Sequence, residues 1–188
     1  VGVVGYSVGG QLALMTAFSQ GVKSLEKCEY GTDRRDPAKD SSVIAVVSQS
    51  GVSNLESAMT ESGQVSDALR LTIGSLLGRA VDDVSALRGA SPSCYVDQLP
   101  ECLNTSPQIP VLQIHGLNDE VIMPIQPQQL HKRLEAQGYP DPRYVRFCSQ
   151  PHSWSTNKQK MLDITMAFLN EQLRGKVVAP EIFDDVGC

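Results

Sequence analysis

The feature that most limits what this chain can fold into is a serine between glycines, at the junction of a predicted strand and a predicted helix. Residues 1–4 are a short β-branched run ended by Gly5, a pattern typical of a buried strand. From Val8 onward, apolar residues recur at helical spacing until Gly21. The intervening sequence GYSVGG fits G-x-S-x-G. Such a serine needs a very tight strand-to-helix turn with positive φ, where side chains two positions away on either side would collide.

Strands and helices alternate along the rest of the chain. Apolar runs predict further strands at 43–47, 111–115 and 144–148. Helical patterns lie at 64–77, 81–88, 124–137 and 156–174. We expect a polar surface loop at 29–42 and an irregular connection at 91–110. The alternation predicts one α/β domain over 1–175, a four-stranded parallel sheet flanked by helices, followed by a tail at 176–188.

A serine nucleophile needs a base, and the chain contains three histidines. His152 follows the last predicted strand, at the same carboxyl edge of the sheet as Ser7, where open α/β sheets carry their catalytic loops. His131 lies among Gln, Lys and Arg in a predicted helix, so we expect a solvated surface residue. His115 ends a strand, and we expect it to pack or hydrogen-bond below the site. We therefore predict that His152 is the base.

The base needs an orienting acid, and HGLNDEV (115–121) supplies one in the loop after the third predicted strand. Asp119 is our prediction, with the neighbouring Glu120 as the alternative. The chain order Ser7, Asp119, His152 is the order found in α/β hydrolases. Each of the three follows the carboxyl end of a predicted strand, which is more specific than any single motif.

The remaining site residues follow from the position of the serine. The amide of Val8, at the helix start, is expected to point to where an oxyanion would form. Tyr6, Trp154 and the loop at 48–55 are candidates for lining the pocket, and simple packing is the alternative for each.

Composition excludes several classes of function. The net charge is −5 with scattered Lys and Arg, so we expect no nucleic-acid partner, and no apolar run approaches the length of a membrane-spanning helix. The five cysteines form no CxxC, so we expect no zinc site, and no organic cofactor is implied. Whether Cys94 and Cys102 form a disulfide or remain thiols stays open, as does a cytoplasmic or secreted location.

The chain resembles α/β-hydrolase esterases of the feruloyl and acetyl-xylan esterase type, which are close to the hormone-sensitive-lipase-like carboxylesterases. The resemblance covers most of the chain. It rests on VGVVGYSVGGQLA at the serine, SSVIAVVSQSGVSNL around the second strand, RGASPSCYV, and PVLQIHGLNDEVIMP around the acid. It implies Ser-His-Asp acyl transfer on a small-molecule ester, with Ser7, His152 and Asp119 in these roles.

Three positions depart from that family. Gln11 stands where a histidine often follows the two glycines, and Met123 displaces the usual proline to Pro124. The glycines that usually precede the catalytic histidine are replaced by Gln150 and Pro151, which predicts a stiffer loop. None of these changes removes a member of the predicted triad.

Two other interpretations remain. Prolyl-oligopeptidase-type serine peptidases share the serine turn, the residue order and the fold. A non-catalytic hydrolase-like fragment is the alternative from another class, because a complete α/β hydrolase has strands before the serine turn and an HGGG-like stretch that this sequence lacks. On this basis we expect the chain to be the C-terminal part of a longer α/β-hydrolase parent, whose N-terminal strands are absent from it.

Overall fold

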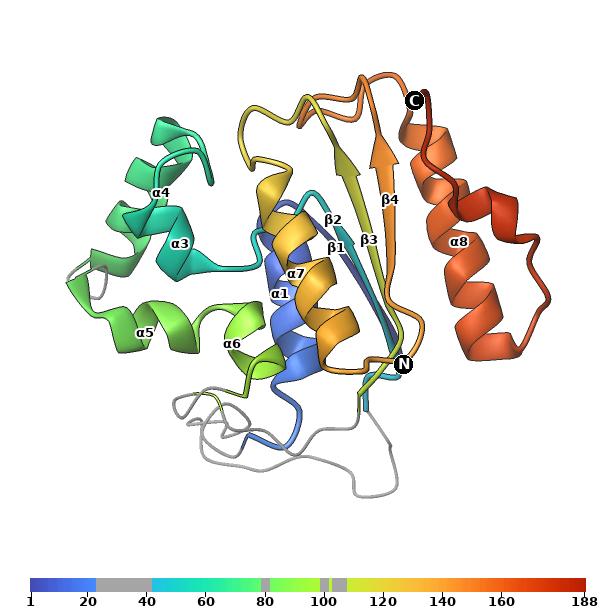
Figure 1. The fold of residues 1–188 in the computed structure, drawn as a ribbon, viewed down its shortest axis with the longest axis horizontal. Helices are drawn as coiled ribbons and strands as arrows, with labels where there is room; N and C mark the ends of the chain where they lie inside the picture. Colours follow the sequence, from blue (N-terminus) through green and yellow to red (C-terminus); the bar gives the residue numbers. More distant parts are fainter. Residues whose placement is uncertain (23–41, 79–81, 99–101, 103–107) are drawn as a thin grey trace, which may run out of the picture.

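A parallel sheet of four strands forms the centre of the computed structural model, which describes residues 1–22, 42–78, 82–98, 102 and 108–188. The strands are β1 (Gly2–Tyr6), β2 (Ala45–Gln49), β3 (Val111–Gly116) and β4 (Arg143–Phe147), in the spatial order β1-β2-β3-β4. Every neighbouring pair is parallel. All four carboxyl ends therefore lie at one edge of the sheet, the upper edge in Figure 1. The predicted four-stranded parallel sheet is confirmed.

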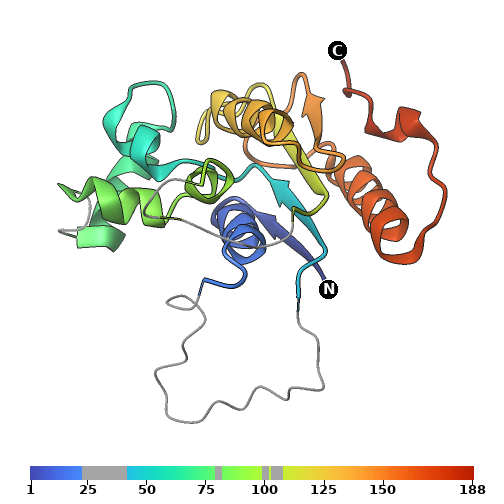
Figure 2. The same ribbon diagram turned by 60° about the horizontal axis from the view of Figure 1, so that its bottom comes forward.

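Helices cover both faces of this sheet (Figures 1 and 2). On one face lie α1 (Val8–Phe18), α6 (Pro92–Val96) and α7 (Ile125–Ala136), and on the other lies α8 (Lys158–Arg174). Successive strand side chains point to opposite faces. Val46 accordingly packs in the cluster with α1 and α7, and Val47 in the cluster with α8. The apolar strand runs show no alternation because both faces are covered.

Three short helices form a separate cluster beside the sheet. They are α3 (Leu55–Thr60), α4 (Asp67–Leu77) and α5 (Val84–Gly89). Neither α3 nor α6 was predicted, because a helix of one or two turns shows too few periodic positions. A capping residue marks the start of α3: the Asn54 side chain accepts a hydrogen bond from Ser57 N at 3.0 Å. The buried Gln126 joins α7 to the start of this cluster by accepting from Ser53 N and Asn54 N.

The first strand is more exposed than its neighbours. β2 and β3 are buried throughout, whereas Val4 in the middle of β1 is 42% exposed. Within the described part of the chain β1 pairs only with β2, so it forms an edge of the sheet, which Figure 2 shows beside the N-terminus. The β-branched run at residues 1–4 predicts a strand with neighbours on both sides in a longer parent, and in the described part of this chain only β2 pairs with it.

The segment predicted as a tail returns to the sheet. After α8 the chain forms a short 3-10 helix, η3 (Pro180–Phe183), and then runs along the end of β4 (Figure 1). Val186 N donates to Arg146 O at 2.8 Å, and Cys148 N donates to Val186 O at 3.0 Å. A disulfide joins Cys148 to Cys188. This contact pairs residues that are far apart in the sequence, so local composition could not predict it.

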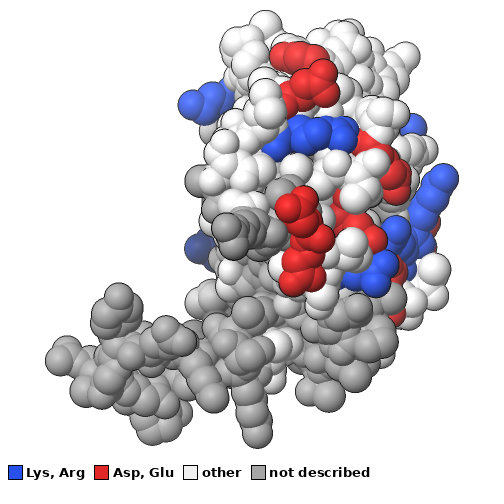
Figure 3. Space-filling model, turned by 90° about the vertical axis from the view of Figure 1, so that its left-hand side faces the viewer, with Lys and Arg blue, Asp and Glu red and all other residues white. Residues whose placement is uncertain are grey.

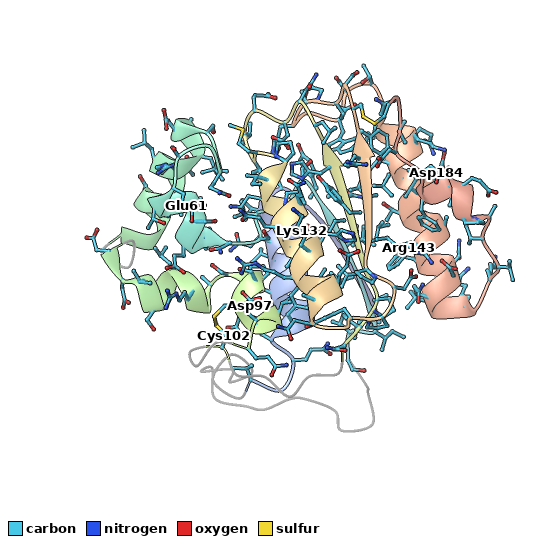
Figure 4. The ribbon with its side chains drawn as sticks, viewed as in Figure 1. Glu61, Asp97, Cys102, Lys132, Arg143 and Asp184 are labelled. Atoms are coloured by element: carbon cyan, nitrogen blue, oxygen red, sulfur yellow. A yellow bond between two sulfur atoms is a disulfide. The ribbon has the colours of Figure 1, made fainter. Side chains whose placement is uncertain are left out.

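Further contacts fix the periphery. A disulfide also joins Cys94 to Cys102, which resolves the question that the sequence left open. Arg143, the first residue of β4 (labelled in Figure 4), contacts α8: its Nη1 donates to Glu171 Oε2 at 2.7 Å. The predicted polar loop at 29–42 lies almost entirely outside the described residues.

In the part that is described, no helix is both long enough and apolar enough to cross a membrane.

Charges of both signs are interspersed on the described part of the face in Figure 3. One pair on α3 and α5 has a hydrogen-bonded geometry, with Arg88 Nε 2.7 Å from Glu56 Oε2. Both partners are partly exposed, so water and salt screen this pair, and we assign it little weight in stability.

The exposed apolar side chains of β1 predict self-association when these 188 residues are expressed alone. An exposed strand edge pairs readily with other chains, and a lysine on such a strand opposes that pairing. We expect Val4→Lys to shift the chain toward monomer, measured by light scattering. Val177→Lys is the matched control, because Val177 is fully exposed and lies outside the sheet. A monomeric unmodified chain, or equal effects of the two substitutions, would contradict this expectation.

Candidate active site

Ser7 lies in the tight turn between β1 and α1 that the sequence predicted. Its φ is 53° and its ψ is −122°, a conformation that non-glycine residues rarely adopt. Backbone hydrogen bonds hold it there: Ser7 N donates to Gln49 O at 2.8 Å, and Ser7 O accepts from Gly10 N at 2.9 Å. The serine is thus anchored both to β2 and to the first turn of α1.

The glycines around the turn do not contribute equally. A Cβ on Gly5 would lie 1.8 Å from Gly9 O, so Gly5 is required, as predicted. A Cβ on Gly9 would meet nothing within 4 Å, so the predicted collision on that side does not occur. Gly10 is the second constrained position, because a Cβ there would lie 3.0 Å from Gly51 Cα, where α1 crosses close to the loop after β2.

The structure brings the three predicted residues into one hydrogen-bonded chain. Ser7 Oγ lies 3.1 Å from His152 Nε2, and His152 Nδ1 lies 2.8 Å from Asp119 Oδ2. A carboxylate only accepts hydrogen bonds, so Nδ1 carries the imidazole proton. Nε2 is then free to accept the Ser7 hydroxyl proton. Parallel strands make this possible, since the loops after β3 and β4 meet at the same edge as the end of β1 (Figure 1).

Asp119 is held as a buried carboxylate. Its side chain has no exposed surface, and Oδ1 accepts from Val121 N at 3.0 Å and Ile122 N at 2.8 Å. Burial alone would raise the pKa of this carboxyl group. The hydrogen bonds from His115, His152 and Ile122 outweigh that effect and hold its pKa well below the ordinary value. The group therefore stays ionised and correctly oriented at neutral pH.

His115 supports the acid from below. It is fully buried, and its Nε2 donates to Ile122 O at 2.8 Å while lying 3.3 Å from Asp119 Oδ2. The sequence placed this residue below the site, and the structure confirms that position. His131 was predicted to be a solvated residue, and this is wrong: its ring is half-buried against Tyr144, 5.8 Å between centroids, and burial lowers its pKa. Polar neighbours in the sequence did not reveal that contact.

The remaining predicted residues separate into two groups. Tyr6 borders the site: its hydroxyl donates to His152 O at 2.7 Å, and its ring lies 5.4 Å from the imidazole. Val8 begins α1 directly after Ser7. Trp154, in contrast, is buried, packs edge-on against Phe147, and donates from Nε1 to Ser50 Oγ at 3.2 Å. Packing, the alternative kept open for Trp154, describes its position.

Glu120, the alternative acid, faces the backbone of His152 and not its ring. Its Oε2 lies 3.5 Å from the backbone N of His152, a long contact, whereas Asp119 contacts the ring itself. Among the described residues, no group of three His, Cys, Asp or Glu side chains is arranged to hold a metal ion. The chemistry that this arrangement permits is proton transfer from a serine to an oriented imidazole.

Sequence reasoning assigned no contacts to Gln150, although it marked this position as unusual. The side chain is fully buried beside His152 and makes several hydrogen bonds. The available sequence signal was a glutamine directly before Pro151 and His152, and its burial shows that the amide must be paired. Its partners come from the same loop, which the sequence could not fold in advance.

Comparisons with known proteins give a family and a fold. Residues 1–134 match the family model described as BD-FAE. No curated protein matches the sequence significantly.

Among solved structures, the acylaminoacyl peptidase of Pyrococcus horikoshii superimposes with a TM-score of 0.68 at 18% identity, over 96% of this chain and 26% of that one. A bifunctional GH43-CE protein of Bacteroides eggerthii gives 0.66 at 23% identity, over 90% and 21%. A truncated carbohydrate esterase from gut microbiota gives 0.66 at 23% identity, over 91% of this chain and 59% of that chain. These neighbours confirm the predicted α/β-hydrolase fold, and this chain spans only part of their length.

The depressed pKa of Asp119 predicts a pH-dependent contribution to stability. A lowered folded-state pKa means that the ionised group stabilises the fold above the unfolded pKa of about 3.9, and that this contribution is lost as pH falls toward the folded value. We expect the loss of unfolding free energy between about pH 6 and about pH 3 to be smaller in Asp119→Asn than in the unmodified chain, measured by urea denaturation. Glu120→Gln is the control. Equal pH dependence in Asp119→Asn and the unmodified chain would contradict this assignment.

Proposed function

Because the chain belongs to the BD-FAE family, we propose that it is the catalytic part of a serine hydrolase that cleaves carboxylic esters through an acyl-enzyme. The observation that carries the proposal is the continuous hydrogen-bonded chain from Ser7 Oγ through His152 to Asp119, with distances of 3.1 Å and 2.8 Å. A serine, a base within hydrogen-bond reach and an acid orienting that base are the elements of nucleophilic acyl transfer.

In the first half of the proposed reaction, Ser7 Oγ attacks the ester carbonyl carbon while His152 Nε2 takes the hydroxyl proton. Asp119 accepts the Nδ1 hydrogen bond throughout, which keeps the imidazole in the required tautomer and stabilises the imidazolium. Collapse of the tetrahedral intermediate breaks the bond to the alcohol oxygen. The alcohol leaves with the proton from Nε2, and the acyl group stays on Ser7.

The oxyanion of the intermediate needs hydrogen-bond donors. Val8 N, the first amide of α1, is our candidate, because the N-terminus of a helix carries a partial positive charge.

In the second half of the reaction, water takes the place of the serine as nucleophile. His152 removes a proton from the water, which attacks the acyl carbon, and Ser7 Oγ leaves with that proton. The acid and a free serine result, and no cofactor takes part in the proposed steps.

A peptidase is the second candidate, and the acylaminoacyl peptidase neighbour favours it. Both reactions use the same three residues and differ in the leaving group, an alcohol or an amine. We favour the ester because of the motif resemblance to feruloyl and acetyl-xylan esterases.

The two disulfides, Cys94 to Cys102 and Cys148 to Cys188, support an oxidising compartment for the protein.

Substitutions in the complete natural protein test the catalytic roles. We expect Ser7→Ala to abolish turnover of p-nitrophenyl acetate. Asp119→Asn should lower kcat by ~10⁴, because it permits the wrong imidazole tautomer. Glu120→Gln is the matched control and should leave kcat nearly unchanged, since Glu120 does not contact the imidazole nitrogens. A larger loss in Glu120→Gln than in Asp119→Asn would show that we have chosen the wrong carboxylate.

A substrate panel separates esterase from peptidase. We expect turnover of p-nitrophenyl acetate and of acetylated or feruloylated sugars, and little cleavage of a proline-containing peptide amide. The measurement is kcat/KM for each substrate with the same preparation, and Ser7→Ala gives the background rate. Efficient amide cleavage with poor ester turnover would favour the peptidase.

A further inference from the structure

Gln150 stands two residues before His152, and the structure gives its side chain a defined place. The residue is fully buried although it lies in a loop, two positions before His152, whose side chain is partly buried. Burial of a primary amide is unfavourable unless its donors and acceptor are paired. The hydrogen bonds of Gln150 therefore indicate what its side chain does in this loop.

The side chain of Gln150 spans the loop that contains His152. Its Nε2 donates to Ser153 O at 2.5 Å, on the far side of the histidine. Its Oε1 accepts from Thr156 Oγ1 at 3.1 Å and from Asn157 Nδ2 at 2.9 Å, directly before α8 begins. One buried amide thus connects residues before and after His152 to the start of a helix that packs on the sheet.

The backbone of the same residue holds the loop that carries the acid. Gln150 O accepts from Asn118 N at 3.1 Å, next to Asp119. The end of β3 approaches this carbonyl so closely that a Cβ on Gly116 would lie 2.0 Å from Gln150 O. Gln150 N in turn donates to Phe147 O at 3.2 Å, which ties the residue to the end of β4. Gln150 is thus bonded to both loops whose side chains form the Asp119–His152 contact.

We propose that Gln150 is a positioning residue that fixes the geometry between His152 and Asp119. The proposal rests on the proposed function, because positioning matters for turnover only if His152 is the base. Gln150 acts through the loop and does not contact the nucleophile. Its buried amide cross-links the loop and restricts the backbone. A glycine at this position would do neither, because glycine has no side chain.

The direct test is Gln150→Met in the complete natural protein, which keeps a long side chain and removes both kinds of hydrogen bond. We expect kcat for p-nitrophenyl acetate to fall by ~10²-fold with little change in KM, because small misplacement of a catalytic group costs about that much. Gln126→Met is the matched control. Gln126 is also a fully buried, multiply bonded glutamine, but its side-chain partners lie in the loop after β2, in α3 and at Gln64. It should lower the melting temperature without lowering kcat per folded molecule.

A milder pair of variants covers the case in which Gln150→Met fails to fold. Thr156→Val removes one donor to Gln150 Oε1, and Thr156→Ser retains the hydroxyl. We expect a several-fold lower kcat in Thr156→Val and rescue in Thr156→Ser, at similar melting temperatures. Equal kcat in both variants, or a kcat loss in Gln150→Met no larger than in Gln126→Met, would overturn the proposal.

A second readout does not require turnover. The proton on His152 Nδ1, bonded to Asp119, is observable by NMR, and we expect it to exchange faster with water in Gln150→Met and Thr156→Val than in the unmodified protein. If the unmodified protein shows a slowly exchanging His152 Nδ1 proton but no turnover, the proposed function is wrong. The positioning role of Gln150 is then decided by the exchange rates of that proton in the two variants. Unchanged exchange in both variants would overturn the positioning role.

Discussion

The hydrogen bond between Asp119 and His152 is the contact on which the rest of the site depends. It sets the imidazole tautomer, so that Nε2 faces Ser7 Oγ at 3.1 Å. It forms because Asp119 is buried with both carboxylate oxygens accepting hydrogen bonds, Oδ1 from two loop amides and Oδ2 from His152. The parallel sheet supplies the larger constraint, since only strands running in the same direction bring three such loops to one edge.

Most of the central fold could be predicted from the sequence because strand–helix alternation and apolar runs are local signals. The four strands and the helices α1, α7 and α8 follow from them within a few residues. The return of Val186 to β4 could not be predicted, because it depends on which segments lie beside a strand in space. The short helices α3 and α6 contain too few residues to show a period.

The candidate site could be predicted for a related reason. Ser7, Asp119 and His152 each follow a strand end, so their convergence follows from topology once the strands are known. Supporting contacts were missed where they depend on loop conformation: the hydrogen bond from Tyr6 to His152 O, the approach of His115 to Asp119, and the buried amide of Gln150. Gly9 shows the opposite error, a motif position whose expected steric role the structure does not support.

Covalent labelling tests the central claim most directly. A fluorophosphonate reacts with a serine only when a neighbouring base activates it, and peptide mass spectrometry identifies the modified residue. We predict a phosphonyl adduct on Ser7 alone in the complete natural protein, and its loss in His152→Ala, because the base that takes the hydroxyl proton is then missing. An adduct on a different residue, or undiminished labelling of Ser7 in His152→Ala, would contradict the account.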